Sequence, residues 1–183
     1  MSRLGRIALV CCSVLAVTCA GPPRVPLPTA PAVDLARYAG TWYEIARLPA
    51  FFQRDCVASR AEYTLLASGT VGVTNSCRTR DGTERSIRGE AEVVDHASNA
   101  RLLVRFDTWF SIFVPAPRGG TYWILDVAPD YGTAIVGTPD RGYLWLLART
   151  PDVEPGRWAA MVERARALGF DVDRLVRGYW PAR

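Results

Sequence analysis

The chain of 183 residues contains no lysine and a single histidine, His96. Its positive charge therefore comes from arginine alone, and these arginines are scattered among 18 acidic residues rather than gathered in one segment. A nucleic-acid-binding face needs a stripe or patch of positive charge, so we expect no nucleic-acid partner. One histidine and few cysteines also give no ligand set with the spacing of a metal site, and the sequence predicts neither a metal nor a cofactor.

The chain also has little continuous apolar sequence. The run Ile7–Val17 is too short to span a bilayer, and it follows Arg3 and Arg6. A short apolar run with basic residues before it and small residues after it is typical of a secretory signal peptide. We therefore predict that residues 1–18 form such a leader.

Two cleavage products are compatible with this leader. In the first, Cys19 becomes the first mature residue and carries a lipid, and residues 19–33 form a Pro-rich tether between the membrane and a domain at residues 34–183. In the second, "TCA" is an ordinary cleavage site with small residues, and the product is soluble.

Two further cysteines, Cys56 and Cys77, remain after the leader and Cys19. In an oxidising compartment they are most simply explained as a disulfide, and the alternative is two buried free thiols. A bridge closing a loop of about twenty residues would stabilise the fold by about 3 kcal/mol.

Between residues 40 and 149, apolar residues alternate with polar ones, and turn-forming residues interrupt the pattern every eight to twelve positions. This pattern predicts eight antiparallel strands joined by short hairpins. Closing such a meander into a barrel removes its two edges and, at eight strands, leaves an interior wide enough for one small ligand. We expect an all-β, eight-stranded, antiparallel up-and-down barrel with strands near 41–48, 56–66, 70–79, 84–94, 101–108, 121–127, 133–138 and 143–149.

The helical signal follows the strands. In "PGRWAAMVERARALGF", apolar residues recur at helical spacing, Pro155 suits the first turn and Gly169 the exit. We predict an α-helix over residues 155–168 whose apolar stripe packs on the outside of the barrel. The last predicted strand supports this arrangement, because Leu144, Leu146 and Ala148 form a second apolar face opposite Trp145.

Alternate residues along the predicted strands, other than those at 84–94 and 133–138, form one face that combines aliphatic residues, tyrosines or tryptophans and one amide. Such a lining suits a pocket for an apolar molecule with a polar end, and the alternative is a solid core. Buried tyrosines need hydrogen-bonding partners, which favours the pocket. The predicted interior residues are Ala61, Tyr63, Val73, Asn75, Leu102, Val104, Phe106, Tyr122, Ile124, Tyr143 and Trp145. Glu44 shares this face, as a head-group contact or as a hydrogen-bonded carboxylate.

The segments "GTWYEIARLP" and "YWILDVAPDYGTAIVGTPDRGYLWLLARTP", in this order, resemble the lipocalins, in particular the bacterial outer-membrane lipoprotein lipocalins and their relative apolipoprotein D. The resemblance implies that Gly40 and Trp42 form the closed end of the barrel and that Arg149 packs across the indole. It also favours Asn75, Tyr122 and Trp145 as pocket residues.

The resemblance further implies that "DTWFSIFVPAP" lies at the open mouth, where Trp109 and Phe113 would meet ligand tails or a membrane. The expected function is the binding, storage or transport of a fatty acid or lysophospholipid in the bacterial envelope, at the outer membrane and facing the periplasm. The alternatives are an envelope interaction protein with a vestigial pocket and, less favoured, an enzyme. For an enzyme the sequence offers no combination of serine, histidine and carboxylate. Dimerisation through the exposed mouth is a further hypothesis.

Overall fold

The computed structural model describes residues 25–107 and 121–180. The predicted signal peptide, Cys19, Trp109 and Phe113 lie outside these residues. Each predicted strand is present, with ends within two residues of the expected ones. The strands are β1 (Gly40–Arg47), β2 (Cys56–Leu65), β3 (Val71–Thr79), β4 (Glu84–Val93), β5 (Arg101–Phe106), β6 (Thr121–Val127), β7 (Thr133–Gly137) and β8 (Leu144–Ala148).

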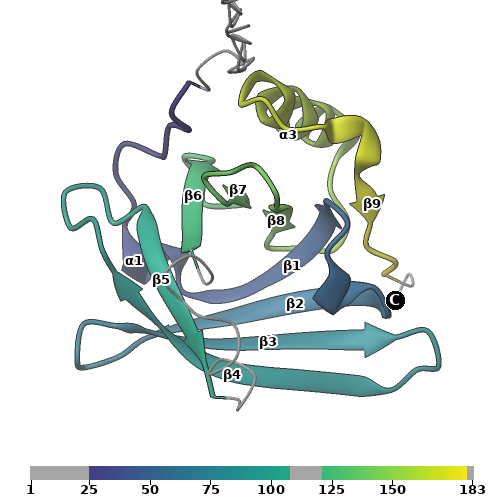
Figure 1. Ribbon diagram of the computed structural model, residues 1–183, viewed down its shortest axis with the longest axis horizontal. Helices are drawn as coiled ribbons and strands as arrows, with labels where there is room; N and C mark the ends of the chain where they lie inside the picture. Colours follow the sequence, from purple (N-terminus) through teal and green to yellow (C-terminus); the bar gives the residue numbers. More distant parts are fainter. Residues whose placement is uncertain (1–24, 108–120, 181–183) are drawn as a thin grey trace, which may run out of the picture.

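The strands form a closed barrel (Figure 1). Each pairs antiparallel with the next, and β1 pairs with β2 through residues 40–44 and with β8 through residues 43–47. The predicted eight-stranded barrel is thereby confirmed. A short strand, β9 (Val176–Arg177), adds to the end of β1.

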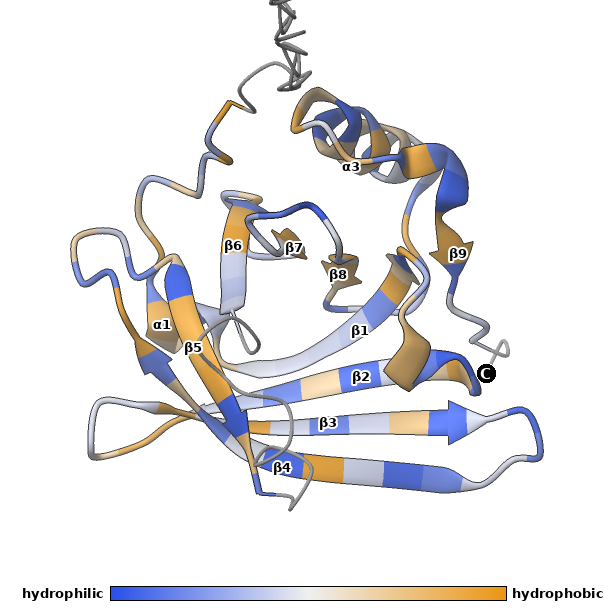
Figure 2. Cartoon of the chain, in the orientation of Figure 1, coloured by the Kyte–Doolittle hydropathy of each residue, from blue (hydrophilic) through white to orange (hydrophobic). Residues whose placement is uncertain are grey.

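One helix packs against the outside of the barrel, as predicted. Helix α3 (Pro155–Ala167) begins with Glu154, whose side chain accepts hydrogen bonds from two backbone N–H groups of the first turn. Its buried residues Met161 and Ala165 belong to an outer apolar cluster with Leu144 and Leu146 of β8. In Figure 2, β7 and β8 are coloured hydrophobic, while the ends of β3 and β4 that meet at their hairpin are hydrophilic.

Within residues 25–107 and 121–180, three further short helices lie at the ends of strands. Helix α1 (Leu35–Tyr38) precedes β1, the 3-10 helix η1 (Phe51–Gln53) connects β1 to β2, and the 3-10 helix η2 (Val172–Arg174) precedes β9. No helix of the described residues is long and apolar enough to cross a membrane.

The second half of the predicted tether packs on the barrel. Leu27, Ala30 and Val33 are buried, and the Ala30 N–H donates to the Ile124 carbonyl of β6. Residues 25–33 are therefore part of the folded body, because Leu27 packs in the outer apolar cluster and Ala30 and Val33 pack in the cluster that contains Trp42.

Cys56 and Cys77 form a disulfide with Cα atoms 5.6 Å apart. The bridge joins the start of β2 to the end of β3 and confirms the predicted pairing. Both ends lie on the same side of the barrel as the β3–β4 hairpin, opposite Trp42.

Candidate ligand-binding site

The end of the barrel at which β1 begins is sealed by an arginine on an indole. Trp42 is fully buried, and the Arg149 guanidinium carbon lies 3.9 Å from the centre of its ring. Trp42 Nε1 donates to the Tyr38 carbonyl at 2.7 Å. Arg149 also donates to backbone carbonyls of the surrounding loops, those of Arg37, Tyr38, Ala39, Thr41 and Tyr131. The structure thus places Arg149 across Trp42, in the arrangement that the resemblance implied.

Helix α1 carries a tyrosine into the barrel above this seal. Asp34 caps the helix by accepting hydrogen bonds from the N–H groups of Ala36 and Arg37, which fixes the turn that presents Tyr38. The Tyr38 ring packs on Trp42 with ring centres 4.9 Å apart. The indole is therefore the floor on which the deepest polar group of the interior rests.

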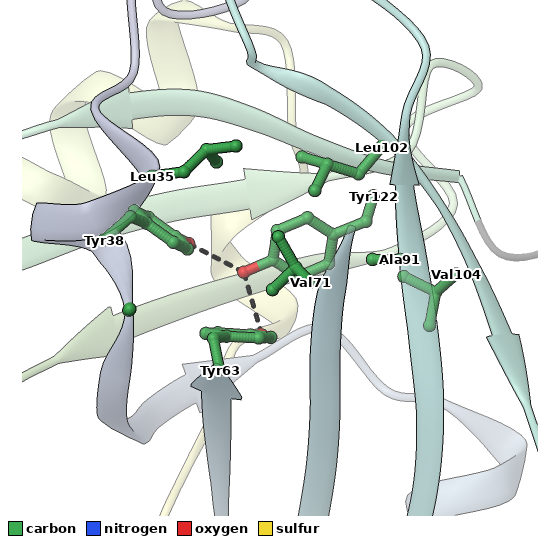
Figure 3. Close-up of a pocket in the computed structure, with 9 residues that line it drawn as sticks. Leu35, Tyr38, Tyr63, Val71, Ala91, Leu102, Val104 and Tyr122 are labelled. Carbon is green, nitrogen blue, oxygen red and sulfur yellow. Dashed lines mark hydrogen bonds between the residues drawn. The ribbon is translucent and has the colours of Figure 1, made fainter. Parts of the chain in front are cut away.

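Three tyrosine hydroxyls meet at this depth (Figure 3). Tyr122 of β6 is the hub: its hydroxyl lies 2.7 Å from that of Tyr38 and accepts from that of Tyr63 at 3.0 Å. Burial raises the pKa of all three, to about 12 for Tyr63. The group, which we term the tyrosine triad, is therefore neutral at physiological pH.

The triad has one more proton than its own hydrogen bonds use. Three hydroxyls supply three protons, and the two contacts within the triad consume two of them. Whichever way the bond between Tyr38 and Tyr122 points, one O–H has no acceptor within the triad. It can donate to a carbonyl, a hydroxyl or a water molecule in the adjoining cavity.

That cavity is small. It has a volume of about 10 Å³, which is room for about one water molecule. Its lining is Leu35, Tyr38, Ala39, Tyr63, Val71, Ala91, Leu102, Val104 and Tyr122. We expected an interior wide enough for a small ligand, and at this position, beside the tyrosine triad, the open space is smaller than that.

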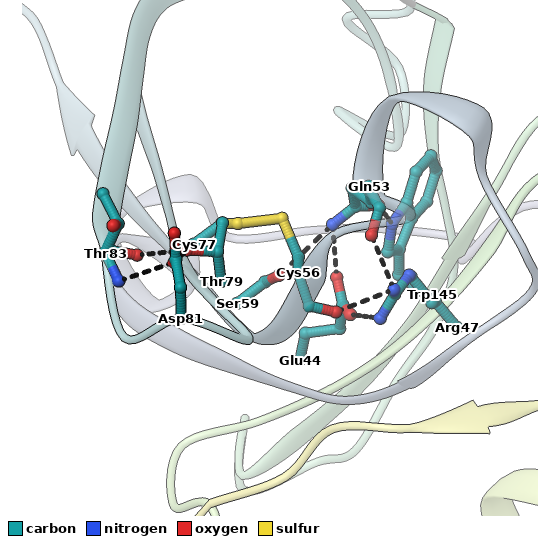
Figure 4. Close-up of a disulfide and its surroundings, with 10 residues drawn as sticks. All are labelled: Glu44, Arg47, Gln53, Cys56, Ser59, Cys77, Thr79, Asp81, Thr83 and Trp145. Carbon is teal, nitrogen blue, oxygen red and sulfur yellow. Dashed lines mark hydrogen bonds and ion pairs between the residues drawn. A yellow bond between two sulfur atoms is a disulfide. The ribbon is translucent and has the colours of Figure 1, made fainter.

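A second polar network lies higher in the barrel, where β1 ends (Figure 4). Glu44 and Arg47 form an ion pair with Arg47 Nη1 2.8 Å from Glu44 Oε1, and each side chain is 5 % exposed. Gln53 donates from Nε2 to the other Glu44 oxygen at 2.8 Å and accepts from Trp145 Nε1 at 3.0 Å. Ser59 is a further contact of Gln53. Glu44 is therefore hydrogen-bonded, in agreement with the second of its two predicted roles.

Arg47 reaches this network because β1 contains a bulge. The pairing with β8 shifts between Glu44 and Ala46, which places both Ile45 and Ala46 in the outer cluster and returns Arg47 to the interior. The C-terminal segment holds the bulge, since Trp180 Nε1 donates to the Glu44 carbonyl and the Gly178 N–H to that of Ile45. Simple alternation along the strand cannot find Arg47, because the extra residue changes its face.

Most of the predicted interior residues share the barrel core. The inner cluster contains Ala61, Tyr63, Val73, Leu102, Val104 and Ile124, with Phe106, Tyr122 and Trp145 packed against it. Asn75 is half-buried on β3 and lies opposite Ala61 in the sheet. Tyr143 stacks on Trp145 near the mouth, with ring centres 5.9 Å apart, and also contacts Phe52.

Besides Arg47, the prediction omitted Tyr38, Leu35, Ala91 and Gln53, which the structure places at these sites. Tyr38 and Leu35 precede the first strand on a single helical turn, so no alternation pattern marks them. Ala91 lies on β4, whose faces the sequence left unassigned. Gln53 is on η1, and the only sign of its role in the sequence is that a polar residue directly follows two phenylalanines. No group of three or more His, Cys, Asp or Glu residues in the described parts of the chain could hold a metal ion.

Comparisons with known proteins agree with this geometry. Residues 33–179 match the family described as lipocalin-like domain. The chain is 40 % identical over 146 residues to temperature-induced lipocalin-1 of Arabidopsis thaliana, which covers 78 % of this chain and 77 % of the relative. It is 34 % identical to the outer membrane lipoprotein Blc of Vibrio cholerae, with 93 % of this chain and 95 % of that protein covered.

Among solved structures, the fold is similar to that of insecticyanin from the tobacco hornworm Manduca sexta. The TM-score is 0.64 at 20 % identity, and the match covers 87 % of this chain and 86 % of insecticyanin. The barrel, its sealed end and the sequence match together show that this chain belongs to the lipocalin family.

Proposed function

We propose that this lipocalin binds a fatty acid or a lysophospholipid inside its barrel and stores or transports it in the bacterial cell envelope. The observation that carries the proposal is the apolar interior above the Trp42–Arg149 seal, with the tyrosine triad at its base. An apolar wall with a few polar groups provides both area for affinity and a point of orientation. Lipocalins are typically binding proteins rather than enzymes, and we infer no catalytic role.

An acyl chain needs more room than the 10 Å³ cavity provides. Binding beside the triad therefore requires interior side chains to move. Burial of each methylene contributes about 0.8 kcal/mol, so a dozen methylenes contribute about 10 kcal/mol before the costs of ordering the ligand and moving side chains are subtracted. Micromolar affinity needs about 8 kcal/mol net. The expected ligand is therefore a long acyl chain, because a short one would not offset these costs.

We place the protein at the outer membrane, facing the periplasm and anchored by a lipid on Cys19. The support is the predicted signal peptide and the similarity to an outer membrane lipoprotein. Cleavage as a soluble periplasmic or secreted protein is the alternative. Mass spectrometry of the N-terminal peptide distinguishes the two, because an acylated Cys19 carries the added lipid mass.

A second function is favoured by the size of the cavity. Tyrosines that leave only a small cavity beside them at the base of the barrel are what an envelope interaction protein with a vestigial pocket would have. Such a protein would bind a partner, or a second copy of itself, through its surface. The exposed aromatic residues Phe51 and Phe52 near the mouth are candidates for that contact.

Native mass spectrometry after mild extraction tests the two functions against each other. Copurified single-chain lipid at one per barrel supports the first proposal, and its absence together with failure to bind a fluorescent fatty acid supports the second. The spectrum also gives the oligomeric state.

Two variants of one strand sharpen this test. Val104 lies in the inner cluster of β5, and its neighbour Leu103 lies on the opposite face. Val104→Phe should lower the affinity for the fluorescent fatty acid at least about tenfold, because the larger side chain fills the interior. Leu103→Phe adds the same ring outside the barrel and should leave binding unchanged.

A further inference from the structure

The second polar network, around Glu44, contains a buried arginine whose hydrogen-bond donors are not all paired. Arg47 Nη1 donates to Glu44, and Nη2 donates to the carbonyls of Gln53 and Cys56 at 2.9 and 3.1 Å. Its Nε is buried and has no hydrogen-bonding partner among the described residues. Buried N–H groups are almost always paired, and a charged donor without an acceptor is a site at which an acceptor binds favourably.

Glu44 is the group that neutralises this arginine. Its two carboxylate oxygens accept hydrogen bonds from Arg47 and Gln53, and the residue is buried. Two charged or titratable groups act on it, Arg47 on its own strand and Tyr63 on β2. Burial raises the pKa of Glu44, against the opposing effect of Arg47. This carboxylate is therefore easier to protonate than one in water.

We propose that Arg47 binds the carboxylate of an anionic single-chain amphiphile, and that Glu44 takes up one proton from solution as the anion binds. The inference rests on the proposed function and assigns its head-group site. Two ionised carboxylates cannot share one buried guanidinium without strong repulsion, so one proton enters with the ligand. The complex then contains one arginine cation, one carboxylate anion and one neutral acid.

The position of the pair fits a head group. Glu44 is two residues beyond Trp42 along β1, and Arg47 ends the strand, so the network lies between the sealed end and η1 at the mouth. A head group on Arg47 leaves the acyl chain directed toward the apolar inner cluster. The neutral tyrosine triad below offers a single O–H donor and no positive charge, so it does not compete for the anion.

The test compares laurate with methyl laurate, which have the same chain and differ in the charged head. Affinities are measured by displacement of a fluorescent fatty acid between pH 6 and pH 8. Glu44 is paired with Arg47 in the free protein and takes up a proton in the complex, so laurate affinity should rise as pH falls. The rise should approach about tenfold per pH unit between the two pKa values of Glu44, while methyl laurate binding should stay flat.

Variants of the pair give a second readout. Glu44→Gln should raise laurate affinity at pH 8 by at least about tenfold relative to methyl laurate and remove the pH dependence, because the competing negative charge is gone. If Glu44→Gln is unstable, the double variant Glu44→Gln/Arg47→Gln replaces it, because it leaves no unpaired charge. The double variant should bind laurate no more tightly than methyl laurate. Arg105 forms an exposed ion pair with Glu92, so Arg105→Gln is the matched control and should leave the affinity for both ligands unchanged.

The outcomes separate the two proposals. If wild-type protein binds both ligands but laurate affinity is independent of pH, or if the double variant keeps the wild-type ratio of laurate to methyl laurate affinity, Arg47 is not the anion site and the lipid-binding function stands. If neither ligand binds to the wild-type protein, both proposals are overturned.

Discussion

Arg149 and Trp42 form a single structural unit in which the guanidinium covers the indole at 3.9 Å and ties together the loops around it. The residues come from opposite ends of the barrel sequence, one in the first strand and the other just after the last. Their contact closes the end of the barrel at the point where β1 meets β8. The sealed end therefore connects the first strand of the barrel to the segment after the last.

Removal of this arginine should destabilise the fold substantially. A cation–π contact contributes about 0.5–2 kcal/mol, and hydrogen bonds from a charged group contribute about 1.5–3 kcal/mol each. Arg149→Ala should lower the free energy of unfolding by about 2–4 kcal/mol, measured by urea denaturation. Arg105→Ala breaks only an exposed ion pair and should cost less than about 1 kcal/mol. Equal losses in the two variants would contradict the role of the seal.

Removal of the Tyr122 hydroxyl, at the centre of the tyrosine triad, should destabilise the fold clearly. Tyr122→Phe removes one oxygen and leaves the hydroxyls of Tyr38 and Tyr63 without the partner that each has in the wild type. Each buried unsatisfied hydroxyl costs about 1–3 kcal/mol. The variant should therefore lose about 2 kcal/mol or more of unfolding free energy in urea titrations.

Replacing the whole triad provides the control for that prediction. Tyr38→Phe/Tyr63→Phe/Tyr122→Phe removes all three hydroxyls and leaves no polar group unpaired. It should be more stable than Tyr122→Phe alone, because apolar replacement of both partners is nearly neutral. A triple variant that is less stable than the single variant would count against the hydrogen-bond account.

Stability should fall at alkaline pH because of these buried tyrosines. The pKa of Tyr63 is about 12 in the folded protein, against about 10 in an unfolded chain. A raised pKa of an acid gives stability that is complete below pH 10 and is lost as pH rises from about 10 to about 12. The difference in absorbance at 295 nm between wild type and Tyr63→Phe should titrate near pH 12. A midpoint near pH 10 would show that Tyr63 is accessible to solvent.

The disulfide should account for a clear part of the stability. It closes a loop with a sequence separation of 21 residues, for which the chain-entropy model gives about 3 kcal/mol. Cys56→Ser/Cys77→Ser should lower the free energy of unfolding by about this amount, and with it the urea midpoint, while the circular dichroism spectrum retains its strand signal. An unchanged midpoint would mean that the bridge adds nothing to the hydrogen bonds between β2 and β3.

The sequence predicted the strands well because their signals are local. Alternation in β8 correctly separates inward Trp145 from outward Leu144 and Leu146, since no bulge interrupts that strand. In β1, one extra residue between Glu44 and Ala46 reverses the pattern, and Arg47 was missed. A bulge held by the distant Trp180 leaves no mark in the pattern of β1 itself.

The interior volume could not be predicted from the sequence either. Alternation shows that Tyr63 and Tyr122 point inward, but whether their rings leave a hollow depends on side-chain packing across the barrel. Tyr38 decides the result here, because a helical turn outside the strand pattern brings its ring onto Trp42 and its hydroxyl to the hub. The sequence therefore predicted many of the residues that face the interior, but not the volume of the cavity between them.

Calorimetric titration with saturated fatty acids of increasing chain length tests the central claim most directly. If the chain is buried in the barrel, each added methylene contributes about 0.8 kcal/mol, so the account predicts a roughly fourfold rise in affinity per methylene, one ligand per protein and a negative heat-capacity change on binding. Absence of binding, or an affinity independent of chain length, would contradict it.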